Sequence, residues 1–499
     1  MKYWTENRTF LFAIAFAAAL FSIFPLTDTD IWWHLACARD WVQTWTPSRS
    51  PVVNVHEYFQ RVVGFVYGIG GAPLLVAFKA VLWGAVFALF LLPQRKSCAE
   101  CRSKSATLAG VTLAAIVLFI FRYHLEIRPV LFSLLFLGIY WNLLPLIFRA
   151  SHLEPRTFFM LLFVLVIQWL WCKCQGLYIL GPLFAVAVLV SVWLDAWRLK
   201  IKLPKRFRFL HVASVLALFA MPFLYGEGMN LFVYPFGLLD RLVGMSPSAA
   251  VFASEIAENR SPLTLLMAGE NALECVVMIA LCIAGLVLAV WNTLKGRIGL
   301  IQICLFATAV LALIAERNFV LFMPVFLYGA VSHCNSFGPR LEARVSYISF
   351  LVLIAFFFGL WARSLLAYDS SMIAFQRVPV HAAAWMASHP HEGRLFNDDR
   401  AGGYLAFVNP DDSIYIDGRF ILKTADFFER YLRYADDPAL FLRDADSLQV
   451  GRAIFPLRYY ARWGKLISTL EPHKDWDVVY RDSLYIVLNH SFRNLVSER

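Results

Sequence analysis

The 499-residue chain is 60% hydrophobic and 16% aromatic, and only 16% of its residues are charged. This composition predicts an integral membrane protein and excludes a soluble enzyme with an ordinary core. The net charge of +10 is uneven, because residues 366–499 hold 16 basic and 18 acidic residues, whereas the rest of the chain holds 29 basic and 17 acidic. The basic surplus in the apolar part favours topology signals and anionic lipid partners over nucleic acid.

An apolar run at Phe10–Leu26 follows the basic residues Lys2 and Arg8. The run has the pattern of a signal peptide, but we interpret it as an uncleaved first span, because the polar cluster after it needs a tether to the membrane. Further apolar segments follow a long first loop at 27–72. They cover residues 73–93, 106–121, 129–148, 157–171, 177–197, 209–224, 273–293, 298–314, 319–333 and 346–366. The sequence therefore predicts about eleven transmembrane helices.

Basic residues mark alternate loops of this arrangement. They are Arg95, Lys96, Arg102 and Lys104, then Arg149 and Arg156, then the group at 198–208, then Lys295 and Arg297, and finally Arg340 and Arg344. All of these groups lie on one side if the N-terminus is cytoplasmic, which the positive-inside rule favours. The first loop, the loop at 225–272 and everything after residue 366 are then extracytoplasmic.

Polar and aromatic residues gather directly after the first apolar run, in the stretch Thr27–Leu35. Asp28, Asp30 and His34 lie there beside two tryptophans, at a membrane boundary where polar groups are costly unless paired or solvated. Apolar spacing over residues 31–45 predicts an amphipathic helix along the membrane surface, with Asp30 and His34 on one face. The cluster favours a functional site, although an N-capping Asp30 and an interfacial tryptophan belt account for the same residues.

Charged and polar residues also collect at the predicted extracytoplasmic ends of the spans. They include His56, Glu57, Arg122, His124, Glu126, Arg128, Lys173, Glu227, Glu258, Asn259, Arg260, Glu316 and Arg317. Several of the turns are short, so we expect these groups to converge near the membrane interface. A carboxylate there can act as general base on an acceptor, while cations bind the leaving phosphate of a lipid-linked donor.

Simpler interpretations of these residues remain. Interfacial anchoring explains any single basic residue, and His56-Glu57 also fits a helix start facing water. Cys98 and Cys101 form a lone CxxC, which without a second pair is weak evidence for a zinc site.

From residue 367 onward the apolar runs are short and the charges are interspersed, which predicts a soluble α/β domain of about 130 residues. Periodicity predicts helices at Val380–Ser388, Phe427–Tyr434 and Ala439–Ala445. Alternation predicts strands at Ser413–Asp417, Trp476–Val479 and Ser483–Leu488, the last two as a hairpin across Arg481-Asp482. Gly402-Gly403-Tyr404 is interpreted as a turn into a strand. The predicted organisation is a polytopic α-helical membrane domain at 1–366, including the first loop, and an extracytoplasmic α/β domain at 367–499.

With its many predicted spans, its polar first loop and its C-terminal α/β domain, the chain resembles the GT-C superfamily of polytopic membrane glycosyltransferases. Within that superfamily it resembles a poorly characterised bacterial branch. The resemblance runs through nearly the whole chain. It is carried by Asp28-Thr29-Asp30-Ile31-Trp32-Trp33-His34-Leu35, His56-Glu57, Arg128-Pro129-Val130-Leu131-Phe132-Ser133, Trp171 through Gly176, Tyr234-Pro235, Glu255 through Pro262, Arg317-Asn318-Phe319, Gly402-Gly403-Tyr404-Leu405 and Ile416-Asp417-Gly418-Arg419. It implies a bacterial inner-membrane protein with a cytoplasmic N-terminus and a periplasmic C-terminal domain.

The resemblance also implies an enzyme that moves a sugar from a polyprenyl-phosphate carrier to an extracytoplasmic glycan, lipid or protein, with inversion at the sugar carbon. An acid of the first outer loop would be the catalytic base or would help bind a divalent cation such as Mg²⁺ or Mn²⁺. Here that acid is Asp30, with Asp28 as its partner or substitute. The expected substrate-binding residues are His34, His56, Glu57, Arg128, Lys173 and Arg317, of which the last three would hold the lipid phosphate.

Two departures from the superfamily pattern affect individual subsites. A Trp-x-Asn-x-His-Gly-like turn is expected where this chain has Trp171-Cys172-Lys173-Cys174-Gln175-Gly176, so that Asn and His are missing. The Trp-Trp-Asp acceptor motif of oligosaccharyltransferases is absent from the predicted C-terminal domain, residues 367–499, which we call the tail. Its absence argues against glycosylation of Asn sequons. Asp417 and Arg419 either touch an acceptor or form a structural Asp–Arg turn.

Two other functional classes compete with the glycosyltransferase. A transporter or flippase of a lipid-linked or envelope substrate would carry charges within its spans and paired broken helices. Here the charges lie mostly at span ends on one side, which favours one-sided chemistry. A non-catalytic scaffold would tolerate changes to the first-loop acids.

Overall fold

The computed structural model describes residues 2–48, 52–92, 104–150, 154–243, 246, 250–252, 255–296, 298–333, 343–459 and 461–491, so Cys98 and Cys101 lie outside the described residues. The chain forms two compact units. The first comprises residues 1–24, 76–243 and 253–370, and the second comprises residues 25–75, 244–252 and 371–499. The first loop is thus grouped with the tail, whereas the sequence assigns it to the membrane domain. The boundary at residue 366 stays a prediction.

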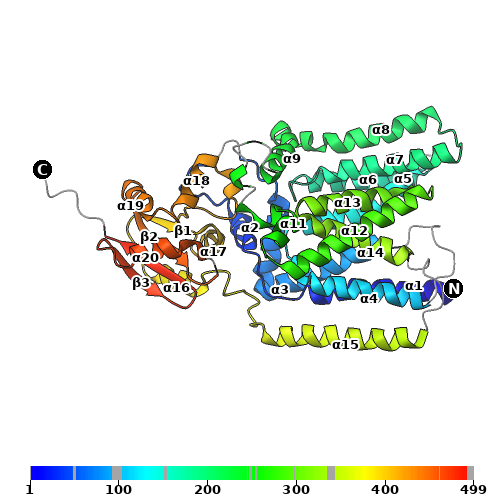
Figure 1. The fold of residues 1–499 in the computed structure, drawn as a ribbon. Helices are drawn as coiled ribbons and strands as arrows, with labels where there is room; N and C mark the ends of the chain where they lie inside the picture. Colours follow the sequence, from blue (N-terminus) through cyan, green and yellow to red (C-terminus); the bar gives the residue numbers. More distant parts are fainter. Residues whose placement is uncertain are drawn as a thin grey trace. The chain divides into compact units, whose positions relative to one another are not determined.

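The first unit is a bundle of helices (Figure 1). Its α-helices are α1 (Lys2–Phe21), α4 (Lys104–Ile120), α5 (Pro129–Phe148), α6 (Pro155–Trp171), α7 (Leu180–Arg198), α8 (Lys205–Ala220), α9 (Gly228–Val243), α11 (Pro262–Met267), α12 (Ala272–Leu294), α13 (Leu300–Ile314), α14 (Phe319–His333) and α15 (Ala343–Ala367). Short 3₁₀ turns join some of them: η1 (Arg122–His124), η2 (Met221–Leu224), η3 (Ala257–Asn259) and η4 (Glu316–Asn318). Helix α3 (Glu57–Leu91) is kinked at Gly70 and Gly71, and its part from residue 76 onward belongs to this unit.

Five helices within the described residues are long and apolar enough to cross a membrane. They are Glu57–Leu91, Pro129–Phe148, Leu180–Arg198, Lys205–Leu224 and Ala272–Leu294. Shorter apolar helices lie at Phe12–Phe21, Gly110–Ile120, Pro155–Trp171, Leu300–Ile314 and Leu351–Ala367. Large apolar side chains remain exposed on these helices, as they do on lipid-facing surfaces. These features are those of a multi-pass membrane protein, although the predicted number of about eleven spans is not confirmed.

Polar side chains inside the bundle bond to neighbouring helices. The indole N–H of Trp171 on α6 donates to Ser133 Oγ of α5 at 2.8 Å. The Tyr140 hydroxyl of α5 donates to Gln168 Oε1 of α6 at 3.0 Å, and Gln168 Nε2 donates to the carbonyl of Tyr178 at 3.1 Å. A buried polar group costs free energy unless it is hydrogen-bonded, so this network fixes how α5 and α6 pack.

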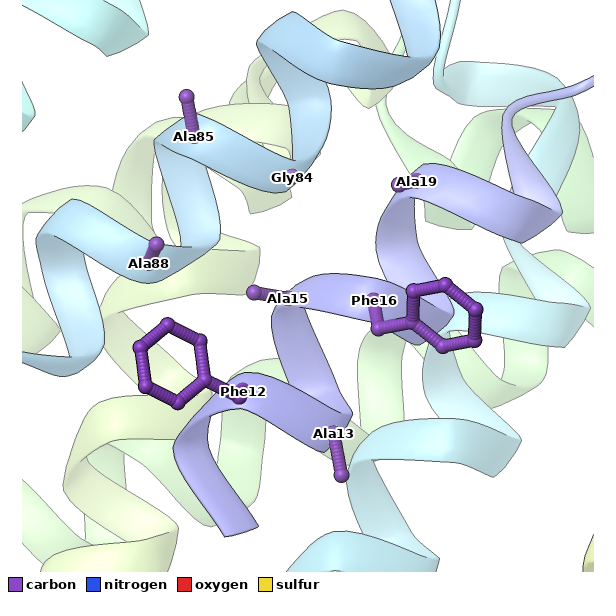
Figure 2. A pocket seen from close by; sticks show the side chains of 8 residues that line it. All are labelled: Phe12, Ala13, Ala15, Phe16, Ala19, Gly84, Ala85 and Ala88. Atoms are coloured by element: carbon purple, nitrogen blue, oxygen red, sulfur yellow. The ribbon is translucent and has the colours of Figure 1, made fainter. Parts of the chain in front are cut away.

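An open apolar recess of about 560 Å³ lies between α1 and α3. Figure 2 shows Phe12 and Phe16 of α1 on one side and Gly84 and Ala88 of α3 on the other. Phe12 and Phe16 are 67% and 64% exposed. All the lining residues are apolar, so the recess offers a surface to lipid but carries no acid or base for chemistry.

The second unit contains a mixed four-stranded sheet in the order β1-β2-β4-β3. Strand β1 (Arg394–Asn397) pairs in parallel with β2 (Val450–Pro456). Strand β4 (Tyr485–His490) pairs antiparallel with both β2 and β3 (Trp476–Arg481). The helices are α16 (Val380–Ser388), α17 (Asp399–Val408), α18 (Ala425–Arg433), α19 (Pro438–Ser447) and α20 (Gly464–Leu470). Their aromatic core includes Phe396, Tyr415, Tyr431, Phe441 and Trp463.

Three tail helices and the β3–β4 hairpin confirm the sequence expectations, but two strand predictions were wrong. Residues 413–417 are an irregular segment instead of a strand. The glycines Gly402 and Gly403 lie inside α17 instead of in a turn. A Cβ on Gly402 would overlap the carbonyl oxygen of Ile416, and one on Gly403 would lie 2.9 Å from the backbone nitrogen of Trp33. These glycines therefore serve close packing around a helix.

Helix α2 (Asp30–Arg39) begins where the sequence predicts and ends earlier than predicted. Asp40 has an extended backbone with φ of −154°, so the expected helix does not reach Trp45. The Trp45 indole donates to the carbonyl of Leu395 at 2.8 Å, which ties the segment after α2 to the first strand of the sheet. Tertiary contacts with the tail thus override helical periodicity here.

Candidate functional site

The first-loop acids lie at the N-terminus of α2, where free backbone N–H groups favour carboxylates. Thr29 occupies the N-cap position, and Asp28 Oδ1 accepts the backbone N–H of Asp30 at 3.2 Å. Asp28 is buried, whereas Asp30 is partly exposed. Asp28 therefore takes the capping contact, and Asp30 is the acid more accessible to a substrate.

A turn of the tail lies directly against the carboxylate of Asp30. A Cβ on Gly418 would overlap Asp30 Oδ1, so that only glycine allows this approach. The neighbours of Gly418 fix the turn, because Arg419 Nε donates to both carboxylate oxygens of Asp417 at 3.0 Å. Arg419 also donates Nη2 to the carbonyl of Val42 at 2.9 Å, which ties the turn to the segment after α2. The buried Asp417–Arg419 pair agrees with the structural interpretation of this turn.

We predict that Gly418→Ala lowers transfer activity by about tenfold or more, because the added methyl group displaces Asp30 and small misplacements of reacting groups are costly. Overpacking should also destabilise the second unit by about 1–3 kcal/mol. Gly464→Ala is the matched control, since its Cβ would meet no atom within 4 Å. Equal activity of the two variants would show that the position of Asp30 does not depend on this turn.

Two predicted histidines, one on α2 and one directly before α3, lie close to each other. The rings of His34 and His56 are 5.2 Å apart and meet edge to face. His34 is buried, and its ring centroid lies 3.5 Å from that of Trp33 and 4.9 Å from that of Phe59. Their role in substrate binding stays a prediction.

Glu57 begins α3 and pairs with Arg61 one turn later, at 2.6 Å between Oε1 and Nη2. The Arg61 side chain is exposed and the Glu57 side chain is half-buried. Such a pair contributes little to stability, so it fits the interpretation of a helix start facing water.

Charged turns gather separately within the first unit. Arg128 Nη1, just before α5, lies 2.6 Å from Glu258 Oε2 in η3. Arg317 Nη1 in η4 donates to Asn259 Oδ1 at 2.9 Å. Burial raises the pKa of Glu258, but the Arg128 guanidinium, helped by Arg317 and His124, outweighs it and holds that pKa at about 2. Two of the predicted phosphate-binding cations thus meet neighbouring residues of one loop.

A possible metal site lies in the same group of turns. Within the described residues, His124, Glu274 and Glu316 bring one ligand atom each to within 4.8 Å of one another. His124 Nε2 lies 3.7 Å from Glu274 Oε2 and 3.8 Å from Glu316 Oε1. Ligands about 2.1 Å from a shared ion would have similar separations, and one imidazole with two carboxylates suits Zn²⁺ or Mn²⁺. This group does not contain Asp28 or Asp30, the acids for which the resemblance implies a metal role.

Lys173 lies in the turn after α6, in the Trp171–Gly176 motif. Its ammonium group is buried and lies 2.9 Å from Glu227 Oε2 and 5.6 Å from the ring centroid of Tyr225. The contacts hold the lysine against the segment just before α9. These contacts do not test whether Lys173 binds phosphate, so that role stays a prediction.

Sequence reasoning singled out the two arginines of the turns and two of the three possible metal ligands, although not as a metal site. His124 and Glu316 belong to the predicted set of span-end charges. Glu274 was missed, because it lies in the first turn of α12 and reads as part of an apolar span. Its only sequence signal is a lone acid near the start of that span.

The fold and these sites define a multi-pass helical membrane protein with a second unit built around a small mixed sheet. No protein-family model and no curated protein matches the chain in sequence. In structure it is similar to the oligosaccharyltransferase AglB of the archaeon Archaeoglobus fulgidus in complex with an inhibitory peptide and a dolichol-phosphate. The TM-score is 0.54 at 14% identity, over 91% of this chain and 69% of that one.

Two further structures of an Archaeoglobus fulgidus oligosaccharyltransferase also match. Its apo form gives a TM-score of 0.51 at 14% identity, over 94% of this chain and 72% of that one. The form tethered to an acceptor peptide containing the NVT sequon gives 0.52 at 14% identity, over 91% and 69%. At 14% identity these likenesses show the fold alone, and the fold that the chain shares with these oligosaccharyltransferases agrees with the GT-C-like fold that the sequence predicts.

Proposed function

We propose that this protein is a membrane glycosyltransferase that moves a sugar from a polyprenyl-phosphate carrier to an acceptor outside the cytoplasm of a bacterial cell. The observation that carries the proposal is the match in fold, over nine-tenths of the chain, to an enzyme whose structure contains dolichol-phosphate. The charged turns of the first unit and the acids of α2 supply the residue types that such a reaction uses.

In the proposed reaction an acceptor hydroxyl or amine attacks the anomeric carbon of the donor. The bond from that carbon to the phosphate oxygen breaks, polyprenyl phosphate leaves, and the sugar carbon is inverted. Asp30 takes the acceptor proton, because its carboxylate is more accessible than that of Asp28. Arg128, Lys173 and Arg317 hold the leaving phosphate, whose charge their cations offset.

The proposal includes a divalent cation at His124, Glu274 and Glu316. When bound, such an ion would stabilise negative charge on the leaving group. We expect Mn²⁺ to raise the thermal unfolding midpoint of the wild type in the absence of any substrate, because a ligand that binds only the folded state stabilises it. Glu316→Gln should remove the increase, whereas Glu471→Gln in the tail should leave it intact. An equal increase in all three proteins would place the ion elsewhere.

The test uses the purified full chain in sealed proteoliposomes, with radiolabelled polyprenyl-phosphate sugars and native membrane extract as the source of acceptor. The proposal predicts label in an acceptor that is no longer extracted with the lipid donor. A flippase would instead move intact donor across the bilayer without cleaving it, and that result would reject the glycosyltransferase.

A further inference from the structure

A small cavity of about 260 Å³ lies in the second unit at the start of α17. Asp398, Arg400, Tyr459, Ala461 and Arg462 line it. They come from the first turn of α17 and from the segment that follows β2, which are brought together by folding of the tail. The proposed transfer reaction uses none of these residues.

Asp398, which lines this cavity, and its neighbour Asp399 are both held inside the protein. Asp398 is 2% exposed; its Oδ1 accepts the backbone N–H of Arg400 at 3.0 Å, and its Oδ2 accepts the indole N–H of Trp463 at 2.7 Å. Asp399 Oδ1 accepts the hydroxyl of Tyr431 at 2.8 Å. Both carboxylates are therefore bound to fixed donors and serve as structural anchors of the helix start.

Cations and a hydroxyl complete the lining of the cavity. Arg400 and Arg462 line it directly, and Tyr459 is 48% exposed beside them. The guanidinium of Arg377 stacks over the Tyr459 ring, 4.8 Å from its centroid, and adds a third positive charge nearby. Guanidinium groups bind planar oxyanions through paired hydrogen bonds, and the start of a ten-residue helix adds a favourable field.

We propose that this cavity binds an oxyanion, a carboxylate or phosphate group carried by the acceptor. The binding itself is independent of the proposed function, whereas the assignment of the occupant to the acceptor rests on it. Arg400 and Arg462 bind the anionic oxygens, and the Tyr459 hydroxyl donates a further hydrogen bond. A neutral sugar gains none of the charge-assisted contacts, so the cavity selects acidic acceptors.

Asp398 makes the binding depend on pH. Burial, and then the neighbouring Asp399, raise the pKa of Asp398 to about 7, although Trp463 and Arg400 act in the opposite direction. Below this pH the Asp398 carboxyl group is neutral. It then no longer offsets the positive charges of Arg400 and Arg462, which attract the anion. Affinity for an anion is therefore expected to fall as the pH rises through about 7. Glucuronate is a suitable probe, because its carboxylate stays ionised from about pH 5.5 to about pH 8.5.

The experiment measures binding of glucuronate, glucose 6-phosphate and glucose to the detergent-solubilised full chain by saturation-transfer NMR. The two anions should bind and glucose should not. Arg400→Gln and Arg462→Gln should each weaken anion binding by about tenfold or more, as expected for loss of a hydrogen bond to a charged group. Arg433→Gln, the same change at an exposed arginine of α18, should have no effect. Tyr459→Phe tests the hydroxyl if an arginine variant fails to fold.

Two results would overturn the proposal: equal binding of glucuronate and glucose, or anion binding that is unchanged in the arginine and Tyr459 variants. Glucuronate binding by the Asp30→Asn variant shows whether anion binding at this cavity is independent of the transfer reaction. Asp30→Asn should bind glucuronate as the wild type does, whether or not either protein transfers sugar. If the wild type transfers sugar but binds no anion, the cavity proposal fails while the proposed function stands.

Discussion

Asp30→Asn should lower sugar transfer by about 10²–10⁴-fold, which is the contribution expected of a positioned general base. The amide keeps the size of the side chain beside Gly418 but does not accept a proton at neutral pH. Asp28→Asn should have a much smaller effect on transfer, because Asp28 caps the backbone N–H of Asp30. Its main cost should be about 0.3–1 kcal/mol of stability from the lost negative charge at the helix N-terminus, because the Asn oxygen still accepts the same N–H.

Asp40→Asn provides the matched control at the other end of α2. Asp40 is exposed and accepts only a local hydrogen bond, from the backbone N–H of Trp41 at 2.7 Å, among the contacts described for it. Transfer rates measured with one labelled donor would rank the three variants. If Asp28→Asn abolished transfer and Asp30→Asn did not, the roles of the two acids would be exchanged.

Arg419→Met should destabilise the second unit by about 3–5 kcal/mol, because it leaves the buried carboxylate of Asp417 without its partner. In the protein, Arg419 and Asp417 are 8% and 2% exposed. Breaking the exposed pair of Arg481 and Glu471 by Arg481→Met should cost about 0–1 kcal/mol. The contrast tests whether burial determines the size of the effect.

Amide hydrogen exchange in the full chain measures this loss directly. The slowest amides of β2 and β4 report opening of the sheet, so their exchange should accelerate strongly in Arg419→Met and little in Arg481→Met. Similar exchange in the two variants would mean that the Asp417–Arg419 pair does not hold the unit together.

Local patterns were enough to predict the start of α2, three tail helices and the β3–β4 hairpin. Each is specified by neighbouring residues: carboxylates at a helix start, apolar periodicity, or two alternating segments around a short turn. The charges at the span ends were also visible, and the structure brings Arg128 to Glu258 and Arg317 to Asn259.

Contacts between segments that are far apart in the chain could not be predicted from local sequence patterns. Strand β1 is only four residues long and pairs in parallel with β2, which is buried throughout and so shows no alternation. The approach of Gly418 to Asp30 depends on the folded tail, and glycine there was interpreted as part of a motif instead of as a packing requirement. The end of α2 at Arg39 is likewise set by contacts with the tail.

The most direct test of the central claim measures both products of the reaction at once. Purified wild-type protein in lipid would be given a polyprenyl-phosphate sugar, labelled in the sugar, and an acceptor fraction, while transferred label and released polyprenyl phosphate are followed together. The account predicts that both appear in equal amounts and that Asp30→Asn suppresses both. Release of polyprenyl phosphate without transferred label would indicate hydrolysis, and label transfer undiminished in Asp30→Asn would contradict the role of the first-loop acid.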